Sequence, residues 1–300
     1  MRNILVLMST YNGEKYLKEQ IDSILAQKNV EVTIRVRDDE STDGTIRILE
    51  EYQKCGKLNW YSSTNMGPAK SFLDLVYNAP LKYDYYAFCD QDDYWKEDKL
   101  YKAIERLEHF DDKPALYHCE LEIVDENLEH IKMTRNCNKT KFIDQTLMVF
   151  YIPGCTMVFN NCLMRKIQER KPEFDLITMH DCWLYYICLG IGGKIISDKN
   201  AYIQYRQHGN NVIGAKRISI RKKIQMICQQ NGSPRAKMID EIIRLYGQDM
   251  KKEMLSKYKT FASYPKSIKA KNYFFKQSTE NVFSTRELQK AKLRILFGSL

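Results

Sequence analysis

Three carboxylates fall within four positions at residues 90–93, directly after the apolar run Tyr85–Cys89. That run is short, aromatic and free of polar alternation, which predicts a buried strand. Its carboxyl end is where open α/β sheets bind ligands. Such crowded like charges favour a hard cation, Mg²⁺ or Mn²⁺, and suggest a metal–diphosphate site. The alternative is a solvated acidic turn in which Asp93 caps a helix that starts near Trp95.

A second acidic pair, Asp38 and Asp39, follows the alternating β-branched segment 30–36. A fixed carboxylate is a strong acceptor for the N3–H group of a pyrimidine base. The same DDxSxDG pattern is also typical of plain loops and helix caps, so both interpretations stay open.

Three polar positions near the start of a predicted third helix suit a phosphate. Asn65, Gly67 and Lys70 combine a helix N-terminus, a glycine that permits close approach, and a cation within reach. Asn-x-Gly is equally typical of an ordinary turn.

Asp181 follows His180 at another predicted helix start. A carboxylate there could act as general base for a hydroxyl group, or could simply favour the helix dipole. Trp183 could stack on a sugar ring or belong to the core.

Two more candidates stand at the end of the predicted strand 201–206. His208 could ligate a metal or bridge to a phosphate, and the alternative is a lone surface histidine. The guanidinium of Arg206 could pair with a diphosphate.

Alternating strands and helices would position these residues. We expect strands at 4–8, 30–36, 58–61 and 85–89, with helices at 14–27, 45–54 and 69–77 between them. Further strands are expected at 115–120, 122–125, 156–159, 194–197 and 201–206, with helices at 162–170 and from residue 179 to about 190. Short polar loops between strands and helices predict a doubly wound, mostly parallel sheet whose loops converge on one edge.

The composition of the 300 residues, with 44% apolar side chains, allows one large domain or one domain with an appendage. No apolar run approaches the roughly 20 residues of a membrane helix. The apolar segment 4–8 is too short for a signal peptide, and nine irregularly spaced cysteines indicate reduced thiols. We therefore expect a cytoplasmic location.

Positive charge is concentrated at the C-terminal end. Residues 215–300 hold 20 Lys/Arg against 6 Asp/Glu, whereas the whole chain carries +9, so residues 1–214 are net acidic. We predict a catalytic domain at 1–214 and a basic helical region at 215–300. Basic amphipathic helices can bind the anionic inner face of a membrane. The alternatives are a helical cap on the catalytic domain and a homodimer interface.

Five motifs, taken in order, resemble those of the family 2 inverting glycosyltransferases, which have the GT-A fold. They are residues 9–14 (STYNGE), 38–45 (DDESTDGT), 65–67 (NMG), 90–93 (DQDD) and 180–181 (HD). The resemblance covers about residues 3–210 and leaves the basic tail outside. Residues 89–95, 180–183 and 205–210 resemble the bacterial rhamnosyltransferase branch.

The resemblance implies a role for each motif. The implied donor-binding residues are Ser9, Thr10, Tyr11, Glu14, Asp38, Asp39, Asn65, Gly67, Lys70, Asp90, Gln91 and Arg206. Asp92 would bind the metal, and His208 would complete the metal or diphosphate site. Asp181 would be the catalytic base. Gly154 and Trp183 would contact the acceptor. The family more often has Glu-Asp where this chain has His-Asp.

The implied reaction is inverting transfer of a sugar, with rhamnosyl favoured, from a dTDP- or UDP-sugar to a saccharide or lipid-linked acceptor. Such enzymes build bacterial surface polysaccharides, including capsule and cell wall. The implied fold is a Rossmann-like α/β sheet flanked by helices, with a C-terminal helical extension.

Two other functions are open at this point. A sugar nucleotidyltransferase usually has a Gly-rich phosphate loop near its N-terminus, whereas residues 9–13 contain one glycine. In the second alternative, the basic tail would bind nucleic acid. The sequence contains no recognisable nucleic-acid-binding module, and the net acidic residues 1–214 would repel the phosphate backbone. We therefore expect no nucleic-acid partner.

Overall fold

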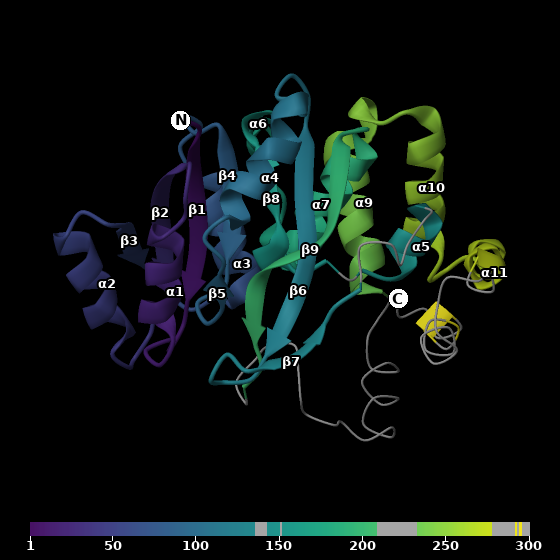
Figure 1. The fold of residues 1–300 in the computed structure, drawn as a ribbon. Coiled ribbons are helices and arrows are strands. Elements are labelled where there is room, and N and C mark those ends of the chain that lie inside the picture. Colours follow the sequence, from purple (N-terminus) through teal and green to yellow (C-terminus); the bar gives the residue numbers. More distant parts are fainter. Residues whose placement is uncertain (136–142, 151, 209–232, 278–291, 293, 296–300) are drawn as a thin grey trace.

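The computed structural model describes residues 1–135, 143–150, 152–208, 233–277, 292 and 294–295 (Figure 1). The strands are β1 (Asn3–Thr10), β2 (Glu31–Asp38), β3 (Asn59–Ser62), β4 (Tyr85–Cys89), β5 (Tyr94–Trp95), β6 (Ala115–Val124), β7 (His130–Met133), β8 (Val158–Asn160) and β9 (Lys194–Arg206). The α-helices are α1 (Leu17–Leu25), α2 (Thr45–Lys54), α3 (Pro68–Tyr77), α4 (Lys99–Leu107), α5 (Ile143–Met148), α6 (Asn161–Gln168), α7 (His180–Gly190), α9 (Pro234–Tyr246), α10 (Lys252–Ser263) and α11 (Ile268–Gln277). In the described residues, the strands form one sheet in the order β3-β2-β1-β4-β8-β6-β9-β5, and β7 pairs with β6.

The first half of the sheet is parallel, and its strands end at a common edge. Thr10 at the end of β1 lies opposite Asp38 of β2, and Met8 lies opposite Cys89 of β4. The polar loops after these strands therefore leave the sheet side by side, as the sequence pattern predicts.

Both faces of the sheet are buried, which explains why β1 and β4 are apolar along their length. Leu5 and Leu7 of β1 join one core cluster with side chains of α3, α6 and α7. Ile4 and Val6 point to the opposite face and join a second cluster with α1, α2 and α4. The predicted α/β class with helices on both faces is confirmed.

The second half of the sheet is mixed. β8 runs antiparallel to both β4 and β6, and β5 runs antiparallel to β9. The strands predicted separately at 194–197 and 201–206 form the single strand β9. Register shifts in its parallel pairing with β6 accommodate the polar residues between the two predicted strands.

The described C-terminal helices pack on the same core as the sheet. Tyr258, Phe261 and Phe274 are fully buried in the cluster that contains Leu5 of β1. The Tyr258 hydroxyl donates to the Tyr186 carbonyl of α7 at 2.7 Å. Figure 1 shows α9 and α10 side by side next to the sheet layer. Most apolar side chains of α9 to α11 thus face the protein, whereas Ile268 at the start of α11 is exposed.

The predicted boundary at residue 214 and the apolar positions between 215 and 232 lie outside the described residues. Among the helices that are described, none combines the length and apolar character needed to cross a bilayer.

Candidate active site

A glutamine side chain joins the loop after β4 to the loop after β1. The Oε1 atom of Gln91 accepts the Tyr11 N–H at 2.9 Å, and its Nε2 atom donates to the Tyr11 carbonyl at 3.0 Å. A side chain at position 13 would overlap the Gln91 carboxamide, so this close approach requires Gly13. The Tyr11 side chain is 49% exposed and offers an aromatic surface to a ligand at this edge.

The loop after β1 also interlocks with the loop after β2. The buried Asp38 carboxylate accepts the Thr10 hydroxyl at 3.0 Å and the Ser41 N–H at 2.9 Å. The Glu14 carboxylate accepts the Gly44 N–H at 2.9 Å, and a side chain at position 44 would overlap it. Asp38 and Glu14 therefore shape these loops through contacts within the protein.

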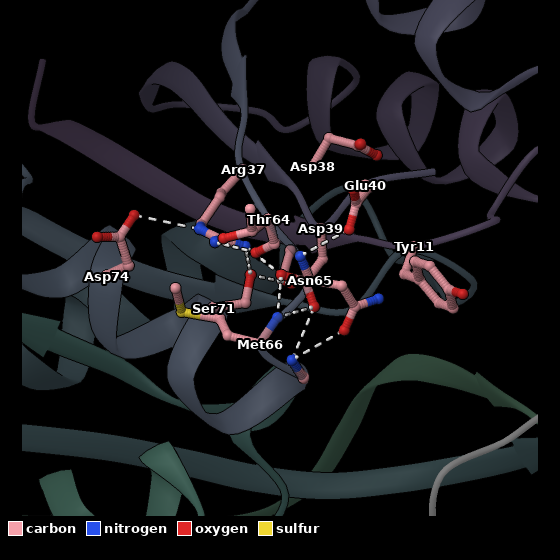
Figure 2. Close-up of polar contacts among 12 residues, drawn as sticks. Tyr11, Arg37, Asp38, Asp39, Glu40, Thr64, Asn65, Met66, Ser71 and Asp74 are labelled. Atoms are coloured by element: carbon pink, nitrogen blue, oxygen red, sulfur yellow. Dashed lines mark hydrogen bonds and ion pairs between the residues drawn. The ribbon is translucent and has the colours of Figure 1, made fainter. Parts of the chain in front are cut away.

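Asp39 lies against the turn formed by residues 64–67 (Figure 2). Its carboxylate pairs with Arg37 and accepts the N–H groups of Met66 at 3.0 Å and Gly67 at 2.9 Å. Gly67 has a φ of 79°, and an added Cβ would meet nothing within 4 Å. Its backbone conformation, rather than close approach, therefore requires glycine. The Gly67 N–H serves Asp39 in this structure instead of facing a phosphate.

Asn65 and Lys70 lie beside this turn. The Asn65 N–H donates to the Glu40 carboxylate at 3.2 Å, and the Lys70 ammonium pairs with Asp175, which is exposed. Glu40 has a φ of 70°, a left-handed conformation that is strained for a residue other than glycine. Backbone strain of this kind concentrates at functional sites.

In the acidic segment after β4, Asp93 is buried, whereas Asp90, Gln91 and Asp92 are half-buried. Asp92 Oδ2 lies 2.9 Å from His208 Nε2. Asp93 accepts the Arg206 N–H at 3.1 Å through Oδ1, while its Oδ2 has no hydrogen-bond partner among the described residues. The chain then enters β5, and α4 begins only at Lys99. The interpretation of Asp93 as a helix cap is therefore wrong.

Asp90 and Asp181 are brought together from opposite halves of the sequence. Burial, together with the charges of Asp92 and Asp181, raises the pKa of Asp90 to about 7. Burial also raises the pKa of Asp181 to about 6, against the lowering effect of backbone hydrogen bonds from Cys182 and Gly154. An added Cβ on Gly154 would lie 3.5 Å from the Asp181 Cβ, so Gly154 borders the same carboxylate.

This donor set fits a divalent cation. Oxygen atoms of Asp90 and Asp93 and the Cys155 sulfur lie within 4.8 Å of one another. The buried Asp93 Oδ2 atom has no hydrogen-bond partner among the described residues, and Asp90 and Asp92 add like charge near it. A hard cation held by carboxylate oxygens of Asp90 and Asp93 would compensate these charges. The predicted metal residues Asp92 and His208 lie outside this cluster and contact each other.

The family follows from the comparison of this chain with known sequences. Residues 5–165 match Glycosyl transferase family 2. The chain belongs to this family. The dTDP-rhamnosyl transferase RfbG of Shigella flexneri is 33% identical over 233 residues, which cover 73% of this chain and 78% of that relative.

Solved structures support the GT-A fold of this family 2 enzyme. S. aureus TarS 1–349, solved in complex with UDP-GlcNAc, superposes with a TM-score of 0.57 at 19% identity, over 99% of this chain and 80% of TarS. A mannosyltransferase from Pyrobaculum calidifontis, in complex with GDP-Man and Mn²⁺, gives 0.57 at 15% identity, over 98% and 85%. The enzyme is a glycosyltransferase, and the nucleotidyltransferase and nucleic-acid-binding alternatives are set aside.

His180 explains how this family 2 enzyme accommodates His-Asp in place of Glu-Asp. The ring stacks on Phe72 at 4.0 Å and meets the edge of Phe88 at 4.7 Å. Burial lowers the pKa of His180 to about 3, so the ring is neutral. Neither ring nitrogen has a hydrogen-bond partner among the described residues. The neutral His180 ring thus packs against aromatic side chains next to Asp181 and does not supply a second acid.

Two predicted contacts do not fit the structure. Trp183 is fully buried and its Nε1 donates to the Tyr77 hydroxyl at 3.3 Å, so it belongs to the core and has no face for a sugar. Arg206 is also buried; its Nε donates to the Asp92 carbonyl at 2.9 Å and its guanidinium pairs with Glu19. Arg206 therefore holds the acidic loop in place instead of facing a diphosphate.

The sequence analysis did not predict two buried cationic side chains, those of Arg37 and Lys99. Arg37 pairs with Asp39, and Lys99 lies with its Nζ 3.2 Å from the centroid of the Trp95 ring. Burial lowers the pKa of Lys99 to about 8. The sequence offered no signal for Arg37, because it stands with Arg35 at the polar positions of the alternating strand β2 and would be expected to face solvent.

Proposed function

We propose that this glycosyltransferase moves a hexosyl group, with rhamnosyl favoured, from a dTDP- or UDP-sugar to a saccharide or lipid-linked acceptor, with inversion of configuration. The observation that carries the proposal is the position of residues 154 and 155 between the two motifs. Gly154 borders Asp181, and the Cys155 sulfur lies within 4.8 Å of oxygen atoms of Asp90 and Asp93, which joins the predicted metal motif to the predicted base. The relationship to RfbG, named a dTDP-rhamnosyl transferase, supports the choice of donor.

Asp181 acts as the general base. With a pKa of about 6 it is ionised at neutral pH and can accept a proton from the attacking hydroxyl group. The acceptor oxygen forms a bond to the anomeric carbon as the bond from that carbon to the diphosphate breaks. The proton moves to Asp181, and the nucleoside diphosphate leaves with the bonding electron pair. By analogy with glycoside hydrolysis, the transition state is oxocarbenium-like.

The nucleotide-sugar donor would bind at the carboxyl ends of β1, β2 and β4. Tyr11 would offer a stacking surface to the base, the loops shaped by Asp38 and Asp39 would hold the nucleoside, and Asp90 would face the ribose or metal. A bound Mg²⁺ or Mn²⁺ would neutralise the charge that develops on the leaving diphosphate. Asp92 and His208 are the residues that would hold it.

Transfer assays with Asp181→Asn test this proposal. The variant keeps the shape of the side chain but loses the base, so we expect unchanged donor binding and transfer reduced by about 10²–10⁴-fold. Transfer at the wild-type rate would reject Asp181 as the base.

We further propose that the enzyme works at the anionic inner face of the membrane, where a lipid-linked acceptor would lie. The support is the excess of 20 Lys/Arg over 6 Asp/Glu in residues 215–300. Co-sedimentation of the full chain with vesicles containing an anionic lipid tests it. Equal binding to neutral vesicles, or none at all, would contradict it and favour a homodimer role for this region.

A further inference from the structure

Arg37, the penultimate residue of β2, is fully buried. Arginine is rarely buried to this extent unless its charge is paired. Nothing in the proposed chemistry uses this guanidinium directly, since it lies beneath the loops and not at their surface. Its contacts therefore indicate what it holds in place.

The guanidinium reaches three separate segments. Its Nη1 pairs with Asp39 in the loop after β2, and its Nη2 donates to the Thr64 carbonyl at 3.0 Å. Its Nε donates to Asp74 of α3 at 3.2 Å. The rigid fork of arginine donors can serve all three at once, whereas a lysine ammonium cannot. Figure 2 shows Arg37 between Asp74 on one side and Asp39 with the turn on the other.

These contacts hold the turn 64–67 at both ends. Arg37 binds the Thr64 carbonyl at the start of the turn, and Asp39 binds the N–H groups of Met66 and Gly67 at its end. Asp39 can do this as an anion only while a positive charge compensates it, because a buried carboxylate without a partner is costly.

The same network extends to the end of β1. The Arg37 Nη1 also donates to the Ser71 hydroxyl at 3.2 Å, and Ser71 lies 2.6 Å from the Ser9 hydroxyl. Arg37 is thus linked to Ser9, Asp39 and the turn that carries Asn65, which are three parts of the predicted donor site.

We propose that Arg37 is a positioning residue for the nucleoside, acting through Asp39. It holds the Asp39 carboxylate and the turn 64–67 in place before the donor arrives, so that less ordering is needed on binding. This inference rests on the proposed function, because it assigns a role within the same donor site.

The experiment is calorimetric titration of the full-length protein with UDP and dTDP in the presence of Mn²⁺, at a temperature well below the melting temperature of each variant. In Arg37→Met, the Thr64 carbonyl and the Asp39 carboxylate have lost their shared partner, so the turn 64–67 must be ordered when the nucleotide binds. We expect binding weakened about 10-fold or more even though the variant is fully folded at this temperature.

The other charged groups near Asp39 do not replace Arg37. Asp74 of α3 and Glu40 after β2 are acidic, and Lys70 of α3 is paired with Asp175. A matched control is Arg35→Met, which removes an arginine from the same face of β2. Arg35 lies over the Tyr61 ring at 5.4 Å, and no contact between it and Asp39 is present in the described structure. We expect this control to bind both nucleotides as the wild type does.

Two results would overturn the inference. Arg37→Met could bind both nucleotides normally, or could lose affinity only in step with its melting temperature, as a purely structural residue would. If that variant does not fold, Arg37→Lys decides. It keeps the charge but loses the fork, so we expect a loss of about 3–10-fold; wild-type affinity would reject the role. A wild-type protein that bound neither nucleotide would instead refute the proposed donor class, and this inference with it.

Discussion

The Gln91 carboxamide makes two hydrogen bonds to the backbone of Tyr11, one to its N–H at 2.9 Å and one to its carbonyl at 3.0 Å. This pair fixes the acidic segment after β4 against the loop that presents the Tyr11 ring. The predicted metal side and the predicted nucleoside side of the donor site are therefore joined by direct hydrogen bonds.

Gly13→Ala tests the importance of this pair. The added methyl group would displace the end of the Gln91 side chain, which is flexible, so the fold should survive. We expect nucleotide affinity to fall several-fold, since two hydrogen bonds worth about 1 kcal/mol each are lost. Gln91→Ala should have the same effect, and the double variant should be no worse than either single one. Additive losses in calorimetric titrations would contradict the pairing.

His208→Ala tests the contact between His208 and Asp92 in the acidic segment after β4. His208 lies 2.9 Å from Asp92, and partners of metal-binding carboxylates typically contribute about 10–100-fold to metal affinity. We expect Mn²⁺ binding, followed by electron paramagnetic resonance, to weaken within this range. The control is His130→Ala, because His130 pairs with Glu122 at 3.0 Å on the surface. Equal effects of the two changes would argue against a metal role for His208.

The raised pKa of Asp181 predicts a pH-dependent stability. Its folded-state pKa of about 6 exceeds the ordinary aspartate pKa of 3.8, so between these two values the folded protein binds more protons than the unfolded chain. Stability is therefore lost as the pH rises from about 4 through about 6. Asp181→Asn removes this loss and should stabilise the protein by on the order of 2 kcal/mol at neutral pH but not at about pH 4. Denaturant unfolding of the wild type and the variant at both pH values measures the change in the free energy of unfolding. An equal change at the two pH values would contradict the burial of the Asp181 charge.

Trp183→Phe separates core packing from acceptor binding. Trp183 is fully buried against Tyr246 and donates to Tyr77. We expect a lower melting temperature with an unchanged KM for the acceptor. Trp60→Phe on β3, where the tryptophan is partly exposed, should change stability less. A raised acceptor KM without loss of stability would restore the sugar-stacking role.

Much of the first half could be predicted from sequence because local signals agree there. The apolar strands, the short polar loops and the helical spacing all indicate one parallel arrangement, and the structure has it. Four of the five motifs that carry the family resemblance also lie in this region, and the fifth, residues 180–181, lies beyond it. The family and the fold could therefore be named before any side chain was placed.

The side-chain roles could not be predicted in the same way. Trp183 and Arg206 belong to chemically suitable residue types, but burial decides their role, and burial depends on packing between distant segments. The same applies to Arg37, whose partners Asp39, Thr64 and Asp74 come from three segments. No spacing rule in the sequence connects them.

The most direct test of the central claim is calorimetric binding of UDP and dTDP, with and without Mn²⁺, to the wild type, Asp92→Asn and Asp181→Asn. The account predicts that the wild type and Asp181→Asn bind one of these nucleotides equally well and only with Mn²⁺, while Asp92→Asn loses this metal-dependent binding. Metal-dependent binding retained by Asp92→Asn, or lost by Asp181→Asn, would contradict the account.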